Sequence, residues 1–313
     1  MTRTVTVGLD GSPESHAAAE WAAREAKMRG LPLRLVNVWE PVPPLARAPL
    51  LGEETQQHWA ERSEMGAPTA GGRGRIPREA AEALRLSHPD VEITVEQLSG
   101  RPGEVLPGAV EDAELLALGS RGLSGFGGYL VGSVGLAVVA KCERPVVLVR
   151  AGEQAADEHT PDPDGTASAT ISYRPVVLGI DTSSPDDAVI AFAFDAAVRR
   201  DTALHVVHGW SLSPYFAYGL PADPRLNAQL AADEATILAE VLRPWRKKFP
   251  AVEVVELSRS GKAADHLVDA SRDALLVVVG RRIRRSPFGT HIGPVTHAVL
   301  HHATAPVVVI PHP

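Results

Sequence analysis

The fold is decided by the stretch TVTVGLDGSPES at residues 4–15, which returns as PVVLGIDTSSPD at residues 175–186. Asp10 of the first copy then aligns with Asp181 of the second, at an offset of 171 residues. Each copy joins a short run of aliphatic and β-branched residues to a turn that contains Ser and Pro. A run of this kind, followed by a turn and a helical stretch, predicts a β-strand that enters a βα unit. The chain is therefore expected to contain the same domain twice.

Further matches extend the repeat along the chain. The segment LRLVNVW at residues 33–39 aligns with LHVVHGW at residues 204–210, at the same offset. Near the end of each copy, RPVVLVR at residues 144–150 aligns with APVVVIP at residues 305–311, at an offset of 161. The smaller offset indicates a shortened connection inside the second copy. A repeat of about 150 residues is the size of a domain and too long for a solenoid unit.

These matches divide the chain into a first domain at residues 1–150, a linker at 151–174 and a second domain at 175–313. The linker is rich in Ala, Asp, Thr and Pro and has little apolar periodicity. A second patch of this kind, GAPTAGGRGRIP at residues 66–77, is expected to be a loop inside the first domain.

Strands and helices alternate in the expected pattern of each copy. In the first copy, strands are expected at residues 5–9, 33–38, 91–98, 115–118 and 146–149, and helices at 13–29, 79–87 and 103–112. In the second copy, a long helix is expected at residues 225–248, which Pro244 should end or kink. Strands that are apolar on both faces suit the centre of a parallel sheet. The pattern predicts an α/β fold with two doubly wound, five-stranded parallel sheets.

Composition narrows the function classes. The chain has 313 residues, is 44% apolar and carries a formal net charge of −7, which excludes wholesale disorder and disfavours a dedicated nucleic-acid binder. The single cysteine, Cys142, cannot form an internal disulfide, and no cluster of cysteines could hold zinc. Neither a long apolar run nor an apolar signal segment occurs in the sequence, so we expect a cytoplasmic protein without a membrane span.

Two features of the first copy fall where a doubly wound sheet binds ligands, beyond the carboxyl ends of its strands. Asp10 ends the first strand, and Gly119 ends the fourth and opens the glycine-rich stretch GSRGLSGFGGYLVGS. This stretch closes with Gly132 and Ser133, directly before a helical run. The start of a helix favours an anion, glycines allow close backbone approach, and Ser133 could be the N-cap or a donor to phosphate. The alternative is a flexible connection with a capped helix, and neither a Walker A motif nor G-x-G-x-x-G is present.

The spacing of this stretch, together with VGLDGS at residues 7–12 and RPVVLV at 144–149, resembles the universal stress protein family, and within it the tandem two-domain members of the ATP-binding branch. The glycine pattern is G-x2-G-x9-G-S. The resemblance implies a parallel sheet with strand order 3-2-1-4-5 and ATP with Mg²⁺ as the ligand. It also places Asp10 near the ribose and Val38 near the adenine, with Gly119, Gly122, Gly132 and Ser133 along the phosphates and Val134 on the same turn.

The second copy departs from this pattern. Gly280 and Gly293 are kept, but Ile283 stands where Gly122 would align, and Pro294 stands where Ser133 would align. Ile283 adds a branched side chain, and Pro294 removes one N–H from the anion site. We therefore expect a weaker second site, formed by Asp181, Gly280 and Gly293. The four arginines at positions 281, 282, 284 and 285 could attract phosphates there, or could be a solvated loop.

Two histidines, His297 and His301, have the i, i+4 spacing of metal ligands on a helix. No carboxylate or cysteine partner accompanies them in the sequence, so a solvent-facing helix is the preferred interpretation and no metal site is expected. Cys142 lies near the end of an apolar helix and is expected in the core.

Three hypotheses about function remain. The first is a non-enzymatic, ATP-binding regulator in the stress response. The second is a slow ATPase or self-phosphorylating enzyme, which the sequence disfavours because Asp10 is the only acid expected at the crevice and nothing activates Ser133. The third is a pairing role, in which the edge strand at residues 307–310 docks on its counterpart at 146–149, within one chain or in a homodimer.

Overall fold

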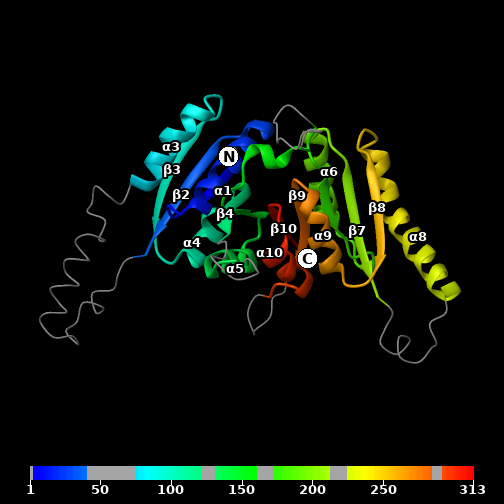
Figure 1. Cartoon of the computed structure of the whole chain (residues 1–313). Coiled ribbons are helices and arrows are strands. Elements are labelled where there is room, and N and C mark those ends of the chain that lie inside the picture. Colours follow the sequence, from blue (N-terminus) through cyan, green and yellow to red (C-terminus); the bar gives the residue numbers. More distant parts are fainter. Residues whose placement is uncertain (1–2, 41–74, 121–130, 161–171, 212–223, 284–290) are drawn as a thin grey trace, which may run out of the picture.

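The structure is a computed structural model that describes residues 3–40, 75–120, 131–160, 172–211, 224–283 and 291–313. The first repeat contains β1 (Thr4–Leu9), α1 (Pro13–Arg29), β2 (Leu33–Trp39), α3 (Arg75–Ser87), β3 (Ile93–Ser99), α4 (Pro102–Ala109), β4 (Ala113–Ser120), α5 (Ser133–Lys141) and β5 (Val146–Arg150). The second repeat contains β6 (Val176–Gly179), α6 (Asp187–Arg200), β7 (Leu204–Trp210), α8 (Pro224–Lys248), β8 (Val254–Ser260), α9 (Ala263–Ala270), β9 (Leu276–Arg282), α10 (Pro294–His302) and β10 (Val307–His312). Figure 1 shows the two repeats arranged around the middle of the molecule.

All ten strands belong to one sheet with the order β3-β2-β1-β4-β5-β10-β9-β6-β7-β8. The first repeat has the expected order 3-2-1-4-5, and the second repeat has the same order when it is read inward from β8 to β10. Strands within a repeat are parallel, whereas β5 and β10 pair in antiparallel fashion, with Val147 opposite Val308. The expected docking of the two edge strands is therefore confirmed, and it occurs within one chain.

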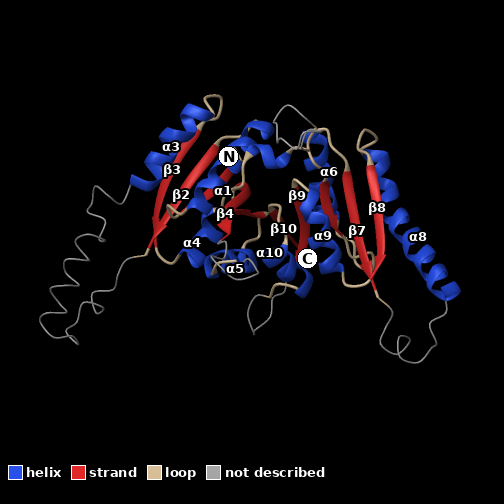
Figure 2. Cartoon of the chain, in the orientation of Figure 1, coloured by secondary structure: helices blue, strands red, loops and turns tan. Residues whose placement is uncertain are grey.

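Helices cover both faces of the sheet, as Figure 2 shows in blue against the red strands. On one face, α1, α3, α6 and α8 pack on a core that includes Trp21, Phe194 and Leu238. On the other face, α4, α5, α9 and α10 pack on a second core that includes Leu106 and Val299. This arrangement confirms the doubly wound fold. Cys142 is 1% exposed and belongs to the second core, as expected.

Local sequence signals set the start and end of α1. The side chain of Ser12 caps the helix by accepting a hydrogen bond from the Ser15 amide at 3.1 Å, and Pro13 takes the first helical position, where a missing N–H costs nothing. Gly30 ends the helix at a φ of 62°, a left-handed conformation that glycine adopts without strain. The helix therefore begins directly at the carboxyl end of β1, which brings its first turn to the edge where the crevice lies.

Several expected boundaries were wrong by a few residues. The third strand begins at Ile93, and the helix α4 ends at Ala109, earlier than the expected residue 112. The expected loop at residues 66–77 ends inside α3, which begins at Arg75, and residues 66–74 lie outside the described part of the chain. Pro244 does not end α8, because the helix continues to Lys248. Tertiary packing supports this last turn, since Trp245 stacks on Phe194 with ring centroids 6.0 Å apart.

The described ends of the linker are folded. Residues Ala155–Glu158 form the 3-10 helix η2, and His159 forms a β-bridge with Tyr173. The buried carboxylate of Glu158 pairs with Arg24 of α1 at 2.7 Å. The described ends of the linker therefore fold and pack against the repeats. Composition does not reveal this, because it depends on contacts with residues far away in the sequence.

Candidate functional site

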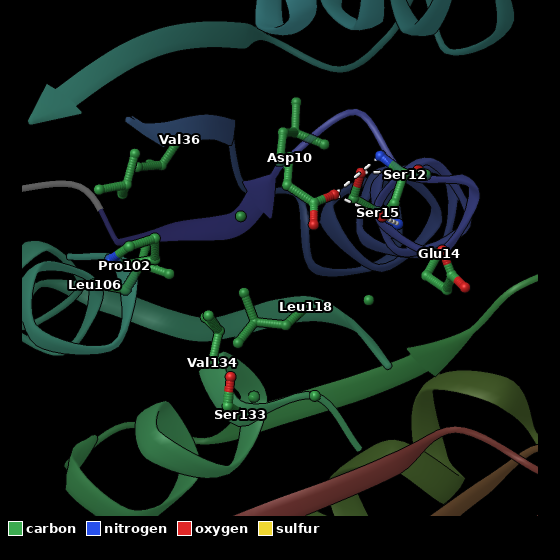
Figure 3. A pocket seen from close by; sticks show the side chains of 16 residues that line it. Asp10, Ser12, Glu14, Ser15, Val36, Pro102, Leu106, Leu118, Ser133 and Val134 are labelled. Atoms are coloured by element: carbon green, nitrogen blue, oxygen red, sulfur yellow. Dashed lines mark hydrogen bonds between the residues drawn. The ribbon is translucent and has the colours of Figure 1, made fainter. Parts of the chain in front are cut away.

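A cavity of about 350 Å³ lies at the carboxyl ends of β1 and β4, between the first turns of α1 and α5. Figure 3 shows the side chains around it. The structure brings together all the described candidate residues of the first repeat: Asp10, Val38, Gly119, Gly132, Ser133 and Val134. Gly122 lies outside the described residues. Sequence reasoning did not name the other lining residues, which are Gly8, Leu9, Ser12, Glu14, Ser15, Val36, Pro102, Leu106, Leu118 and Gly135.

Asp10 is held by the turn that follows it. Its Oδ1 atom accepts hydrogen bonds from the Ser12 amide at 2.9 Å and from the Ser12 hydroxyl at 2.5 Å. Gly11, between them, has a φ of 84°, which favours glycine. Figure 3 shows the Asp10 side chain directed from β1 toward the space that Leu118 and Val134 border. The turn thus presents an exposed, oriented carboxylate to the cavity.

Gly119 forms the floor where β4 meets α1. A Cβ atom at this position would lie 2.6 Å from the Glu14 carbonyl carbon and 2.7 Å from the Ser15 nitrogen. These are backbone atoms, so no side-chain rotation could relieve the clash. From the sequence, this glycine is expected to allow close approach of phosphate. The structure adds another reason, because glycine is needed for the first turn of α1 to pack on β4.

The N-terminus of α5 faces the cavity without a side-chain cap. Its N-cap residue is Gly132, so the alternative that Ser133 is the N-cap is wrong. The first hydrogen bond of the helix runs from the Leu136 amide to the Gly132 carbonyl at 3.1 Å. The amides of Ser133, Val134 and Gly135 precede this bond, and in any α-helix such groups need partners from outside the helix. Together with the helix dipole they favour an anion at this end of the cavity.

Glu14 corrects the expectation that Asp10 is the only acid at the crevice. The half-buried Glu14 side chain lines the same cavity from the first turn of α1. The signal was present in the sequence, because a helix that starts at Pro13 turns its next residues toward the edge that holds Asp10. These two acids are the charged side chains among the described lining residues.

Most polar groups on the cavity wall carry oxygen atoms that could coordinate a metal ion, which fits the preference of Mg²⁺ for oxygen ligands. The carboxylates of Asp10 and Glu14 and the hydroxyls of Ser12 and Ser133 all line the cavity. Within the described residues, however, no group of three or more His, Cys, Asp or Glu side chains could hold a metal ion. A magnesium ion would therefore need oxygens from a ligand as well as from the protein.

The opposite wall of the cavity is apolar. It consists of Val36, Val38, Pro102, Leu106 and Leu118, which come from β2, α4 and β4. Such a surface suits the faces of a planar ring. The cavity therefore has an apolar end and an end that combines helix amides with carboxylates.

The second repeat has a corresponding cavity of about 470 Å³, and it brings together Asp181, Gly280 and Gly293. The Asp10 turn is repeated here, because Asp181 Oδ1 accepts hydrogen bonds from the Ser183 amide at 3.0 Å and from the Ser183 hydroxyl at 2.6 Å. Gly293 is the N-cap of α10, as Gly132 is of α5. The two crevices therefore share a backbone plan.

The space over Gly119 in the first crevice and over Gly280 in the second is filled differently. The helix α6 begins at Asp187, three residues after the position that aligns with Pro13, and only a side chain of its first turn, that of Val189, lies near Gly280, with Cγ2 3.2 Å from the place of a Cβ atom there. The imidazole of His312 takes this space, with Nε2 2.9 Å from the place of a Cβ atom on Gly280. His312 Nδ1 also lies 3.6 Å from a carboxylate oxygen of Asp186, the residue that caps α6. Side chains of His312 and Val189 thus lie over Gly280, where the backbone of the first turn of α1 lies over Gly119.

The arginines after Gly280 do not form one anion site. Arg281 is 4% exposed and donates a hydrogen bond to the Cys142 carbonyl of the first repeat at 2.6 Å, so it points away from the second crevice. Arg282 lines the crevice and donates to the Ser184 hydroxyl at 2.7 Å. Residues 284 and 285 lie outside the described part of the chain.

The second crevice also lacks the side chain at the position of Val38. Gly209 stands there, and a Cβ atom on it would lie 2.4 Å from Cα of Ala263. The start of α9 therefore packs directly on β7. No side chain therefore stands in the second crevice at the position that Val38 occupies in the first.

The expected solvent-facing helix of His297 and His301 is correct for only one of them. His297 is exposed, with its ring centroid 4.5 Å from that of His301. His301 is half-buried, and its Nδ1 accepts a hydrogen bond from the Val131 amide of the first repeat at 3.5 Å. The spacing that resembled a metal site thus belongs, at His301, to the contact between the repeats.

Comparisons with known proteins agree with the repeated architecture. The family model described as "Universal stress protein family" matches residues 1–150 and 172–311. Universal stress protein Rv1996 of Mycobacterium tuberculosis is 32% identical over 323 residues, which covers 97% of this chain and 94% of the relative. Universal stress protein Rv2005c of the same species is 33% identical over 313 residues, with 97% and 96% coverage. The crystal structure of a universal stress protein from Archaeoglobus fulgidus superimposes with a TM-score of 0.59 at 18% identity, covering 98% of this chain and 97% of that chain. Over the described residues, every helix is too short or too polar to span a membrane.

Proposed function

The chain belongs to the universal stress protein family, and we propose that it is a cytoplasmic, non-enzymatic regulator of the stress response that binds ATP in its first crevice. One observation carries the proposal: the uncapped N-terminus of α5 and the oriented carboxylate of Asp10 line one cavity with an apolar wall. A nucleotide has a phosphate chain, a ribose and a planar base, and these three parts match the three kinds of surface.

The α5 end of the cavity is the proposed phosphate site. The amides of Ser133, Val134 and Gly135 would donate to phosphate oxygens, as at other anion-binding helix starts. The Ser133 hydroxyl would add a further donor. Gly119, Gly122 and Gly132 would complete this site, in keeping with the glycine spacing of the sequence.

Asp10 and Val38 are the proposed contacts for the nucleoside. The Asp10 carboxylate would accept hydrogen bonds from ribose hydroxyls, while the Ser12 amide and hydroxyl donate to its Oδ1 atom and orient it. Val38 and Leu106 would contact the base at the apolar end. Mg²⁺ would bind with the phosphates, where its charge offsets their repulsion from Asp10 and Glu14.

Binding without rapid turnover is the main proposal, and a slow ATPase or self-phosphorylating activity is the second candidate. Phosphoryl transfer needs a positioned base or nucleophile and stabilisation of the transferred group. The single observation that favours the second candidate is Glu14, which places a second carboxylate in the cavity. Ser133 would be the acceptor in self-phosphorylation.

The test is calorimetric titration of the full chain with ATP and Mg²⁺. Gly132→Val is expected to weaken binding by more than tenfold, which corresponds to about 1.4 kcal/mol. Gly293→Val is the matched control, because both glycines are N-caps with nearly equal backbone angles, a φ of −62° against −61°. Neither position requires glycine for its backbone conformation. Equal binding by wild type and Gly132→Val would contradict the proposed site.

A further inference from the structure

The helix α5 lies at the middle of the molecule, beside the second repeat. The antiparallel pairing of β5 with β10 brings α5 and α10 to the same face of the sheet. Figure 1 shows them next to one another, α5 in green and α10 in red. The helix that would bind phosphate in the first crevice is therefore also part of the contact between the repeats.

Arg281 of the second repeat holds the C-terminal end of α5. It lies in β9, is 4% exposed, and its Nη2 donates to the Cys142 carbonyl at 2.6 Å. Cys142 is the C-cap of α5, where carbonyl groups lack partners within the helix and the dipole is negative. A buried guanidinium at this point both satisfies a carbonyl and offsets the dipole. Burial lowers the pKa of Arg281 from its ordinary value.

This contact has no equivalent in the opposite direction. The residue of the first repeat that aligns with Arg281 is Ser120, whose hydroxyl donates to the Val149 carbonyl of its own repeat at 3.1 Å. At this position, therefore, a side chain of the second repeat contacts the first repeat, whereas the aligned side chain of the first repeat contacts its own repeat.

His301 of the second repeat holds the other end of α5. Its Nδ1 accepts from the amide of Val131 at 3.5 Å, a long hydrogen bond, and Val131 directly precedes the N-cap Gly132. The Val131 side chain is 6% exposed, and its Cγ1 lies 3.2 Å from the place of a Cβ atom on Gly135. Ala140 aligns with His301 and has no hydrogen-bonding side chain, so this contact is also found in one direction only.

We propose that Arg281 and His301 are positioning residues of the first crevice: the second repeat holds α5 at both ends and so sets the direction of the amides that receive the phosphates. This inference rests on the proposed nucleotide site. It assigns the second repeat a role in the affinity of the first. We call the contacts of Arg281 and His301 with the two ends of α5 the clamp. Gly280 and Arg282, the neighbours of Arg281, line the second crevice, so the clamp lies at the border of that crevice.

The test compares two buried arginines that cross between the repeats. Arg281→Met removes the clamp on α5, whereas Arg200→Met, the control, removes an ion pair to Glu25 on the other face of the sheet. Both changes should lower the midpoint of thermal unfolding. Only Arg281→Met is expected to weaken ATP binding, by at least tenfold, with Arg200→Met staying within twofold of wild type. Arg281→Lys, which keeps a cation and a donor, should restore most of the affinity.

Hydrogen exchange gives a readout that does not depend on nucleotide. The amides of Leu136 and Cys142 close the first and last turns of α5 by donating to Gly132 and Val138. In the free protein, Arg281→Met should speed their exchange more than Arg200→Met does. If exchange responds in this way while wild type binds no ATP, the clamp is supported and the proposed function fails. If exchange and ATP affinity are the same in both variants, the clamp is wrong.

A second pair of variants keeps the proposal testable if Arg281→Met does not fold. His301→Gln retains an acceptor for the Val131 amide, whereas His301→Leu does not. His301→Leu should weaken ATP binding and speed exchange of the Leu136 amide, and His301→Gln should do so to a smaller extent. Equal behaviour of the two variants would overturn the role of His301.

Discussion

Glu25 of α1 and Arg200 of α6 form an ion pair across the two repeats at 2.6 Å, with side chains only 2% and 1% exposed. Arg29 donates to the same carboxylate at 2.6 Å. Arg29 and Arg200 occupy aligned positions in the two repeats, whereas Glu25 aligns with Ala196. One carboxylate thus serves two equivalent arginines. Burial alone would raise the pKa of Glu25, but the two arginines hold it below its ordinary value.

Removal of this carboxylate should destabilise the chain strongly. Glu25→Ala leaves Arg29 and Arg200 buried beside each other without their shared partner, and the loss of one member of a buried pair costs about 3–5 kcal/mol. Urea unfolding should show this loss. Because the arginines are equivalent, Glu25→Ala combined with Ala196→Glu should recover part of it. A double variant that is no more stable than Glu25→Ala would show that the position of the carboxylate cannot be exchanged.

Glu153, in the folded start of the linker, should make stability depend on pH in the direction opposite to that of an ordinary ion pair. Burial, with the carboxylates of Asp157 and Glu158, raises the pKa of Glu153 from 4.5 to about 7, and Arg24 and Arg174 oppose this only in part. Between these values the folded chain binds a proton that the unfolded chain has released. The stability contribution of Glu153 therefore falls as pH rises from about 4.5 to 7.

Glu153→Gln measures this effect directly. At pH 8 the variant should be more stable than wild type, by on the order of 1–3 kcal/mol, because a neutral side chain avoids the cost of a buried charge. At pH 4.5 the two proteins should differ little. Urea titrations at both values provide the comparison. A stability difference that stays constant between the two pH values would contradict the raised pKa.

Nucleotide stoichiometry should be close to one per chain. The second crevice has Pro294 in place of a donor, Ile283 in place of a glycine, and His312 over Gly280. Combining His312→Ala, Ile283→Gly and Pro294→Ser should raise the stoichiometry toward two, measured by equilibrium dialysis with ATP and Mg²⁺. Asp181, whose turn matches that of Asp10, is already in place. Two tight sites in wild type would mean that these departures do not control binding.

Multiple turnover of ATP should be negligible. The oriented Asp10 and the nearby Glu14 lie in the cavity. A working phosphotransfer enzyme, which turns over at about 1 s⁻¹ or faster, also needs a positioned base or nucleophile and groups that stabilise the transferred phosphoryl group. Release of phosphate by the purified chain should be far slower than this. A rate near 1 s⁻¹ that Glu14→Gln abolishes would identify an enzyme and assign the second carboxylate to catalysis.

Sequence patterns predicted the fold because it repeats, and most of the candidate site because of the position of Asp10 and the glycine spacing of the first copy. The alignment of Asp10 with Asp181 located the carboxyl end of the first strand in each repeat, and the glycine spacing located the start of α5. The role of Gly119 in packing was not visible, because it depends on how closely α1 approaches β4. Glu14 could have been found from the helix start at Pro13.

The position of His312 could not have been found in this way. It lies over Gly280 together with Val189 of α6, a helix that starts three residues later than α1 does, and this late start is not evident from the aligned residues. Arg281 presents the same difficulty. Its sequence neighbours suggested phosphate, but the alternation of side chains along β9 and the β5–β10 pairing turn it toward the other repeat.

The antiparallel joint between β5 and β10 also bears on how the two halves can evolve. In an assembly of two identical chains, a substitution appears in both crevices at once, and a change that improves one role must be tolerated in the other. Here the partners are unlike halves of a single polypeptide, produced in equal number and held at high local concentration. His312 and Pro294 stand in the second crevice and leave the first unchanged. Covalent fusion therefore allows one half to change without altering the other.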